Sequence, residues 1–205
     1  MPETLSDDSR CGAASLLNAW LLLGGRFEDA AGRLGLSVSQ RSLTYQNIHL
    51  AQDALYRHSN TNDRDGLTLG LSYTHRQGQI LSVTLDNEIQ DAIQLLGLKA
   101  QPLSGETVDG FNQRRASVGR FIARNPFGVL LTGIHLDTRS GALKAVSDQY
   151  PMNHFVVIHR QGGAFYLVDT GASDNGMGNS RRQLSSDEVE RFVYNTPAHV
   201  IGLTR

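Results

Sequence analysis

The chain has 205 residues, a length typical of one domain, and 40% of them are hydrophobic, which is enough to build a folded core. Its 19 basic and 20 acidic residues leave a net charge of −1 at pH 7, so the composition indicates no nucleic-acid partner and no attraction to an anionic membrane. The single cysteine, Cys11, excludes an intramolecular disulfide and a zinc site built from cysteines.

Two features of the sequence bear on where the protein acts. The longest apolar run, residues 19–23, is far shorter than the about 20 residues that a membrane-spanning helix needs. The N-terminus is polar and acidic, unlike the basic and then apolar start of a signal peptide. We therefore expect a soluble protein without a membrane span and without a signal peptide.

The first part of the chain is predicted to be helical. The first helix covers residues 11–23 and ends at Gly24 and Gly25, a common end signal. Its apolar residues surround the helix axis, which is typical of a central and buried helix. Further helices are predicted at about 27–34, 43–57, 85–96 and 108–124.

From about residue 127 the pattern changes to alternating apolar residues, many of them β-branched, which predicts strands. The predicted strands are 129–136, 143–147, 155–159, 165–169 and 199–204. A helix at 186–194, capped by Ser185 or Ser186, interrupts them. Helices first and strands second indicate an α+β fold with an antiparallel sheet. We expect one domain over 1–205, with a helical half at about 1–126 and a sheet half at about 127–205.

A predicted β-hairpin near the C-terminus brings a histidine to an aspartate. Strands 154–159 and 164–169 are separated by four residues, two of which are glycines. If the loop is symmetric, His154 lies directly opposite Asp169, and the two side chains project from the same face about 4.5–5.5 Å apart at Cβ. A slip of one residue would send them to opposite faces, so the prediction depends on the register.

These two residues suit a cysteine nucleophile. A carboxylate that accepts a hydrogen bond from one ring nitrogen of a histidine fixes its tautomer, and leaves the other nitrogen to take a proton. Cys11 lies at the start of the first helix, where the helix dipole stabilises a thiolate, and Gly12 leaves room for a substrate. The plainer alternatives are an ion pair between His154 and Asp169 at the strand ends, and a cysteine that is only a small buried apolar residue.

Three short motifs carry a resemblance to a known family. They are Cys-Gly-Ala-Ala-Ser-Leu-Leu-Asn from residue 11, Asn-His-Phe-Val-Val-Ile from residue 153 and Phe-Tyr-Leu-Val-Asp from residue 165. In their order and in the His–Asp spacing, the chain resembles the papain-like cysteine peptidases, in particular the bacteriocin-processing peptidases and, more loosely, the YopT-like bacterial effector proteases. The motifs are short, and residues 26–126 match no pattern of the family.

The resemblance implies a papain-like fold, with the nucleophile helix packed on the antiparallel sheet and the active site between them. It implies that Cys11 is the nucleophile, His154 the general base and Asp169 the residue that orients it. It also implies a protein or peptide substrate and no metal or organic cofactor. By analogy with the effector proteases, we expect a bacterial toxin or effector domain, which is cytoplasmic or is delivered as a secreted effector, and for which an inhibitor or immunity protein is a candidate partner.

The chain departs from the family at the oxyanion hole. These families usually carry a glutamine about six residues before the cysteine, and this position is Leu5. The backbone N–H of Cys11 still supplies one donor. The candidates for a second donor nearby are Ser6, Asp7 and Asp8.

The sequence leaves other functions open. The same triad would serve a transglutaminase, a glutamine deamidase or an acyltransferase, because all of them begin with the same thioester. A non-catalytic module that binds peptides is another alternative. The motif Asp169-Thr170-Gly171 also matches aspartic proteases, but the order of helices and strands does not, which makes this a remote alternative.

Three more features of the sequence bear on the candidate site. Residues 171–183 are predicted to form a long loop, either a solvated connection or a substrate rim in which Arg181 and Arg182 meet an acidic substrate. His135 is the rival general base, and Asp137 would project from the same face of its strand. The stretch 169–178 resembles a calcium loop only faintly, because Ser180 stands where such a loop needs an acid.

Overall fold

The computed structural model describes residues 11–59, 87–103, 111–137, 139–147, 149–150, 154–169, 180–196 and 200–205. A seven-stranded sheet lies at the centre, and every pairing in it is antiparallel. Its strands follow the order β1-β7-β2-β4-β5-β6, and β3 pairs only with β2. They are β1 (Lys99–Pro102), β2 (Val129–Asp137), β3 (Ala142–Lys144), β4 (His154–Gln161), β5 (Ala164–Asp169), β6 (Ser180–Gln183) and β7 (Val200–Thr204).

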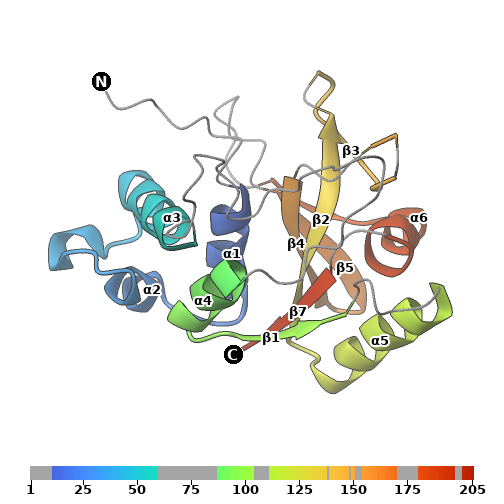
Figure 1. Cartoon of the computed structure of the whole chain (residues 1–205), viewed down its shortest axis with the longest axis horizontal. Helices are drawn as coiled ribbons and strands as arrows, with labels where there is room; N and C mark the ends of the chain where they lie inside the picture. Colours follow the sequence, from blue (N-terminus) through green and yellow to red (C-terminus); the bar gives the residue numbers. More distant parts are fainter. Residues whose placement is uncertain are drawn as a thin grey trace.

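Helices cover both faces of the sheet, so the molecule has three layers (Figure 1). On one face lie α1 (Cys11–Leu22), α2 (Phe27–Arg33), α3 (Tyr45–Ser59) and α4 (Asn87–Leu95), with the short 3₁₀-helix η2 (Val38–Gln40). On the other face lie α5 (Phe111–Arg124), α6 (Ser186–Val189) and the π-helical turn η4 (Glu190–Tyr194). The α+β class and the antiparallel sheet predicted from the sequence are therefore confirmed.

Helix α1 is the central helix, as its all-round apolar sequence predicts. Every residue from Gly12 to Trp20 is buried, because the helix packs on the sheet with one side and on α2, α3 and α4 with the others. The indole Nε1 of Trp20 donates to the carbonyl oxygen of Arg26 at 2.9 Å. Gly25 lies against the same indole, and a Cβ there would come within 2.2 Å of it, so packing requires this glycine, whereas Gly24 is favoured by its positive φ of 78°.

The second core lies on the opposite face, between the sheet and α5 with η4. Phe121 of α5 reaches the sheet over Gly202 of β7, where a Cβ would lie 2.5 Å from the phenyl ring. The glycine thus allows a close approach of helix and strand. Among the described residues, no helix is long and apolar enough to cross a bilayer.

The hairpin of β4 and β5 has a different register from the predicted one. Its loop is two residues long, Gly162 and Gly163, both with positive φ (58° and 86°), as a type I′ turn requires. Gln161 therefore pairs with Ala164 and His159 with Tyr166, two residues away from the predicted register. Because the shift is an even number of residues, His154 and Asp169 remain on the same face, as diagonal neighbours.

Three other elements differ from the prediction. Strand β1 comes from the part of the chain predicted to be helical, and it joins the sheet beside β7. Strand β6 occupies the end of the predicted 171–183 loop and pairs with β5. Strand β3 ends at Lys144 and is shorter than predicted. The sheet therefore receives strands from both halves of the chain.

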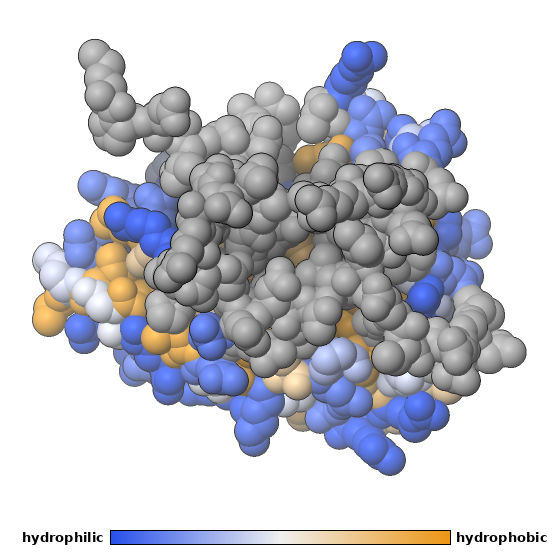
Figure 2. Space-filling model, viewed as in Figure 1, coloured by the Kyte–Doolittle hydropathy of each residue, from blue (hydrophilic) through white to orange (hydrophobic). Residues whose placement is uncertain are grey.

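The described surface is mostly polar, with apolar exceptions. Figure 2 shows apolar surface over the region of α2 and α3. Val38 and Leu43, in the segment between these helices, are 81% and 62% exposed. Phe127, in the turn between α5 and β2, is 85% exposed.

Thr132 is expected to be a weak point of the second core. It is fully buried in β2 between Val156 and Val200 of the neighbouring strands, and its Oγ1 makes no hydrogen bond to any residue described here. Thr132→Val should therefore raise the free energy of unfolding by about 1–2 kcal/mol, since it removes an unpaired buried hydroxyl. Chemical denaturation tests this, with Thr132→Ser as the control. The serine keeps the hydroxyl and loses a methyl group, so it should lower the stability; a valine variant less stable than the wild type would contradict the account.

Candidate active site

The three residues of the predicted triad lie at the ends of three adjacent elements. Cys11 is the first residue of α1, His154 the first of β4 and Asp169 the last of β5. Helix α1 packs on β4, and β4 pairs with β5, so the three residues meet where these strands begin and end, at one end of the sheet. Cys11 is half-buried, whereas His154 and Asp169 are buried.

His154 and Asp169 form a hydrogen bond inside the protein. Nε2 of His154 lies 2.7 Å from Oδ1 of Asp169. The side chains are only 4% and 10% exposed, so water competes little with this contact. A hydrogen bond of this kind between charged groups is short and strong, and it fixes the orientation of the imidazole ring. Since Nε2 is engaged, Nδ1 is the ring nitrogen left for another partner.

That partner is Cys11, whose side chain hydrogen-bonds to the His154 imidazole. Burial alone would lower the pKa of His154, but its hydrogen bonds to Asp169 and Cys11 and its electrostatic attraction to both outweigh this effect and raise the pKa to about 9. At neutral pH the ring is therefore an imidazolium that lies between a carboxylate and a sulfur. A cation in this position favours the thiolate form of a cysteine.

A residue that the sequence analysis did not single out connects the helix to the strand. Ser15 lies one helical turn after Cys11 and is fully buried. Its Oγ donates to the carbonyl oxygen of Phe155, the residue after His154, at 3.0 Å. This hydrogen bond fixes the position of α1 along β4, and so the position of Cys11 relative to His154. The signal in the sequence was a hydroxyl in an otherwise apolar stretch of the helix.

Removing this hydroxyl is expected to affect stability and thiol reactivity together. Ser15→Ala leaves the buried carbonyl of Phe155 without its donor, which should lower the free energy of unfolding by about 1–3 kcal/mol. The alkylation rate of Cys11 should also fall, because the helix start is no longer fixed against His154. Ser117→Ala is the matched control, since its hydroxyl only accepts from Arg120 on the surface of α5. Unchanged alkylation in a Ser15→Ala protein that folds would show that Ser15 does not position the site.

Of the other predicted site residues, those before the helix lie outside the described residues, and the two arginines lie in a strand. Leu5 and the oxyanion candidates Ser6, Asp7 and Asp8 lie outside the described residues. Arg181 and Arg182 lie in β6, not in a loop. Arg182 forms an ion pair with Glu188 at 2.8 Å, and Arg181 contacts His159 and Gln161 near the opposite end of β4 from His154. The prediction that they flank the site as a substrate rim is therefore not supported by their contacts.

The structure also shows the contacts of the residues on which the alternative interpretations depend, namely His135, Asp137 and Asp169. His135 lies in β2 with its ring 5.3 Å from that of Tyr150. Asp137 pairs with Lys144 at 2.9 Å, which holds the pKa of its carboxyl far below the usual range. Asp169 faces an imidazole, whereas an aspartic protease needs a second carboxylate there.

No group of three or more histidine, cysteine or acidic side chains that would hold a metal ion occurs among the described residues.

Comparison with known proteins does not assign the chain to a family. No family model, no curated protein and no solved structure matches the chain.

Proposed function

We propose that the protein is a cysteine protease that hydrolyses a peptide or isopeptide bond with Cys11, His154 and Asp169. The observation that carries the proposal is the buried imidazole of His154, which is held by Asp169 through one nitrogen and contacts Cys11 with its other side. A half-buried sulfur at a helix start, beside a fixed imidazolium, is the arrangement that an activated thiolate needs.

In the proposed reaction the Cys11 thiolate attacks the carbonyl carbon of the scissile bond. The C–N bond breaks as His154 donates its Nδ1 proton to the leaving amine, and a thioester to Cys11 remains. Neutral His154 then takes a proton from water, the hydroxide attacks the thioester, and the carboxylic acid leaves while the thiolate and the imidazolium are restored. Asp169 keeps Nδ1 toward the sulfur and stabilises the imidazolium in both steps.

The helix start provides electrostatic support for the tetrahedral intermediate. The first N–H groups of a helix have no partner within the helix, so those at the start of α1 are free to donate to an oxyanion formed on the carbonyl beside Cys11. The backbone N–H of Cys11 is the proposed first donor. The second donor is proposed to come from Ser6, Asp7 or Asp8, and of these three Ser6 has a neutral hydroxyl.

The reaction type is tested with a pool of peptides and folded proteins analysed by mass spectrometry after incubation with the enzyme. We expect new termini from chain cleavage, and none with Cys11→Ala. A mass gain of about one unit on glutamine, without cleavage, would instead indicate a deamidase that uses the same thioester chemistry. Covalent joining of two substrates would indicate a transglutaminase. Absence of all three products, with a slowly alkylated Cys11, would leave a peptide-binding module.

The wider context is part of the same proposal. A central helix that begins with the nucleophile and packs on an antiparallel sheet supports a papain-like arrangement. We further propose that the protein acts as a bacterial effector or toxin domain, with an inhibitory partner that covers the cysteine. Copurification of a partner with wild-type protein, and its competition with iodoacetamide for Cys11, tests this part separately.

A further inference from the structure

The end of β2 projects past the proposed active site as a hairpin with β3. Residues 129–134 of β2 pair with β4, and the last of these pairs joins Ile134 to His154. Residues 135–137 continue beyond this pair and join β3 instead. Three strand steps correspond to about 10 Å, and in Figure 1 β2 accordingly extends above both α1 and β4.

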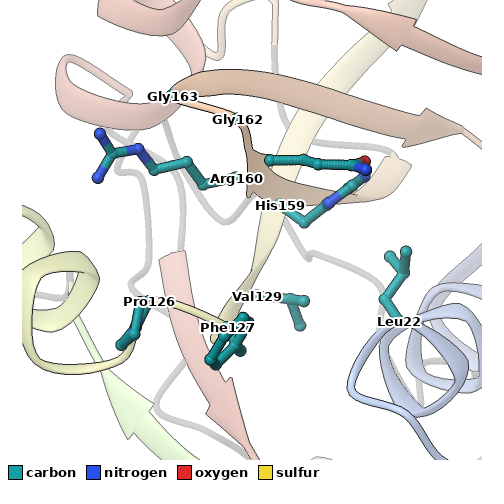
Figure 3. Close-up of a pocket in the computed structure, with 9 residues that line it drawn as sticks. Leu22, Pro126, Phe127, Val129, His159, Arg160, Gly162 and Gly163 are labelled. Carbon is teal, nitrogen blue, oxygen red and sulfur yellow. The ribbon is translucent and has the colours of Figure 1, made fainter.

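Helix α1 lies along the part of β2 that pairs with β4, and its first residue lies at the base of the hairpin. At its C-terminal end, Leu22 lines a half-open cavity together with Val129 and His159 (Figure 3). At its N-terminal end, Cys11 contacts His154. The eleven helical steps between Cys11 and Leu22 measure about 16 Å, as do the five strand steps between the two ends of this pairing. The face of the hairpin on the α1 side therefore lies beyond the helix, next to Cys11.

Three side chains form a surface on this side, which we call the hairpin wall: His135, Lys144 and Tyr150. His135 has the same position in the strand alternation as Leu131, which belongs to the core under α1. Lys144 lies directly opposite His135 and so projects from the same face. The ring of Tyr150 lies 5.3 Å from that of His135, and two backbone hydrogen bonds with Ser147, both 3.0 Å long, fix its backbone. All three residues are half-buried, so part of each is open to a ligand.

The ammonium group of the hairpin wall is compensated by a carboxylate. Nζ of Lys144 lies 2.9 Å from Oδ2 of Asp137 and 4.3 Å from the centre of the Tyr150 ring. The hydrogen bond between them raises the pKa of Lys144 and holds that of Asp137 far below its usual range, so the pair stays ionised and has no net charge. An acidic substrate side chain would compete with Asp137 for Lys144, and a basic one would be repelled by the ammonium group over the ring. The hairpin wall therefore favours an uncharged side chain.

We propose that the hairpin wall binds an uncharged aromatic side chain of the substrate beside the scissile bond, and that Tyr150 is the residue that determines this specificity. The substrate ring packs on the ring of Tyr150, offset or edge to face. The contacts with His135 and Lys144 already hold the Tyr150 ring, so little side-chain freedom is lost on binding. The peptide substrate rests on the proposed function, whereas the position of the ring beside Cys11 does not.

Alkylation of Cys11 with two reagents tests the hairpin wall without any need for turnover. The rates of N-benzyl and N-propyl iodoacetamide are compared at pH 9, where a thiol with the ordinary pKa of about 8.5 also reacts. The chain has one cysteine, so the added mass belongs to Cys11. We expect the benzyl-to-propyl rate ratio to be about threefold to tenfold higher for the protein than for glutathione. Tyr150→Ala should lower the ratio to that of glutathione, and Tyr150→Phe, which keeps the ring, should preserve it.

Matched variants separate the hairpin wall from general effects. Tyr45→Ala removes another exposed ring, 76% exposed at the start of α3, and should keep the ratio of the wild type. Tyr150→Leu keeps much of the side-chain volume without the ring and should lower the ratio as alanine does, and melting temperatures show that each variant is folded. A wild-type ratio equal to that of glutathione, or a high ratio in folded Tyr150→Ala or Tyr150→Leu, would overturn the proposal.

A peptide library separates a failure of the hairpin wall from a failure of the proposed protease. We expect the cleaved peptides to carry an aromatic residue at one position beside the scissile bond, and this preference to disappear in Tyr150→Ala. Cleavage without that preference, together with the ratio of glutathione in alkylation, would refute the hairpin wall and leave the protease. Selective alkylation without cleavage of any peptide would refute the protease and leave a surface for aromatic rings beside Cys11.

Discussion

Replacing His154 with alanine is expected to slow the alkylation of Cys11 by iodoacetamide at pH 6 by at least about tenfold. His154, with a pKa of about 9, is almost fully protonated at pH 6, and in the proposed mechanism this imidazolium stabilises the thiolate of Cys11. A free thiol with a pKa of about 8.5 is only about 0.3% ionised there. The alkylation rate should differ by less than the fraction of thiolate does, because a stabilised thiolate is a weaker nucleophile.

The pH profile of alkylation makes this prediction specific. The wild-type rate should be nearly constant between pH 6 and 8, whereas that of His154→Ala should rise about tenfold per pH unit toward pH 8.5. His135→Ala is the matched control, because His135 lies on the neighbouring strand and is the rival base. Equal losses of alkylation rate in both variants would mean that neither histidine alone activates Cys11. A loss of rate in His135→Ala alone would identify His135 as the base in place of His154.

Asp169→Asn is expected to lower the pKa of His154 from about 9 to near or below 6.5. The variant removes the negative charge and the carboxylate acceptor that favour the imidazolium, while the burial that opposes it remains. At pH 7 the ring then loses its proton, and an amide leaves its tautomer poorly defined. Turnover should fall about 10³-fold as a result. Nitrogen-detected NMR titration of the histidine rings measures the pKa directly.

Asp137→Asn is the control for this prediction. Asp137 is also a carboxylate in an ion pair, but its partner is Lys144 on β3. Its replacement should leave the titration of His154 unchanged. If His154 still titrates near pH 9 in Asp169→Asn, the hydrogen bond between them does not maintain the imidazolium, and the proposed role of Asp169 is wrong.

The elements with a strong local pattern were predictable from the sequence. Helix α1 is apolar on all sides, and the structure buries every residue from Gly12 to Trp20. Strands β2, β4 and β5 are rich in β-branched, aromatic and other apolar residues, which is typical of buried strands. By contrast, the four residues of β1 are all exposed and include Pro102. This edge strand therefore has no apolar alternation by which the sequence could indicate it.

The contact of His154 with Asp169 was predictable although its register was not. The predicted loop of four residues is in fact a turn of two, because Gly162 and Gly163 both adopt the left-handed conformation. Side chains alternate with a period of two, so this even shift kept His154 and Asp169 on one face. An odd shift would have separated them.

Contacts between residues far apart in the chain could not be predicted from local sequence patterns. The bond from Ser15 to Phe155 joins residues 140 positions apart, and no local pattern encodes it. The contacts of Arg181 with His159 and Gln161 likewise depend on the pairing of β6 with β5, in a segment predicted as a loop. Such contacts follow from the order of strands in the sheet, which periodicity alone does not give.

The most direct test of the account is the thiolate absorbance near 240 nm, followed from pH 4 to pH 10 with Cys11→Ala as the blank. The chain has one cysteine, so the whole signal belongs to the proposed nucleophile. We expect the absorbance of one thiolate in the wild type at pH 6, and its loss at that pH in His154→Ala, with recovery only near pH 8.5. A signal that appears only near pH 8.5 in both proteins would contradict the activation of Cys11 by His154.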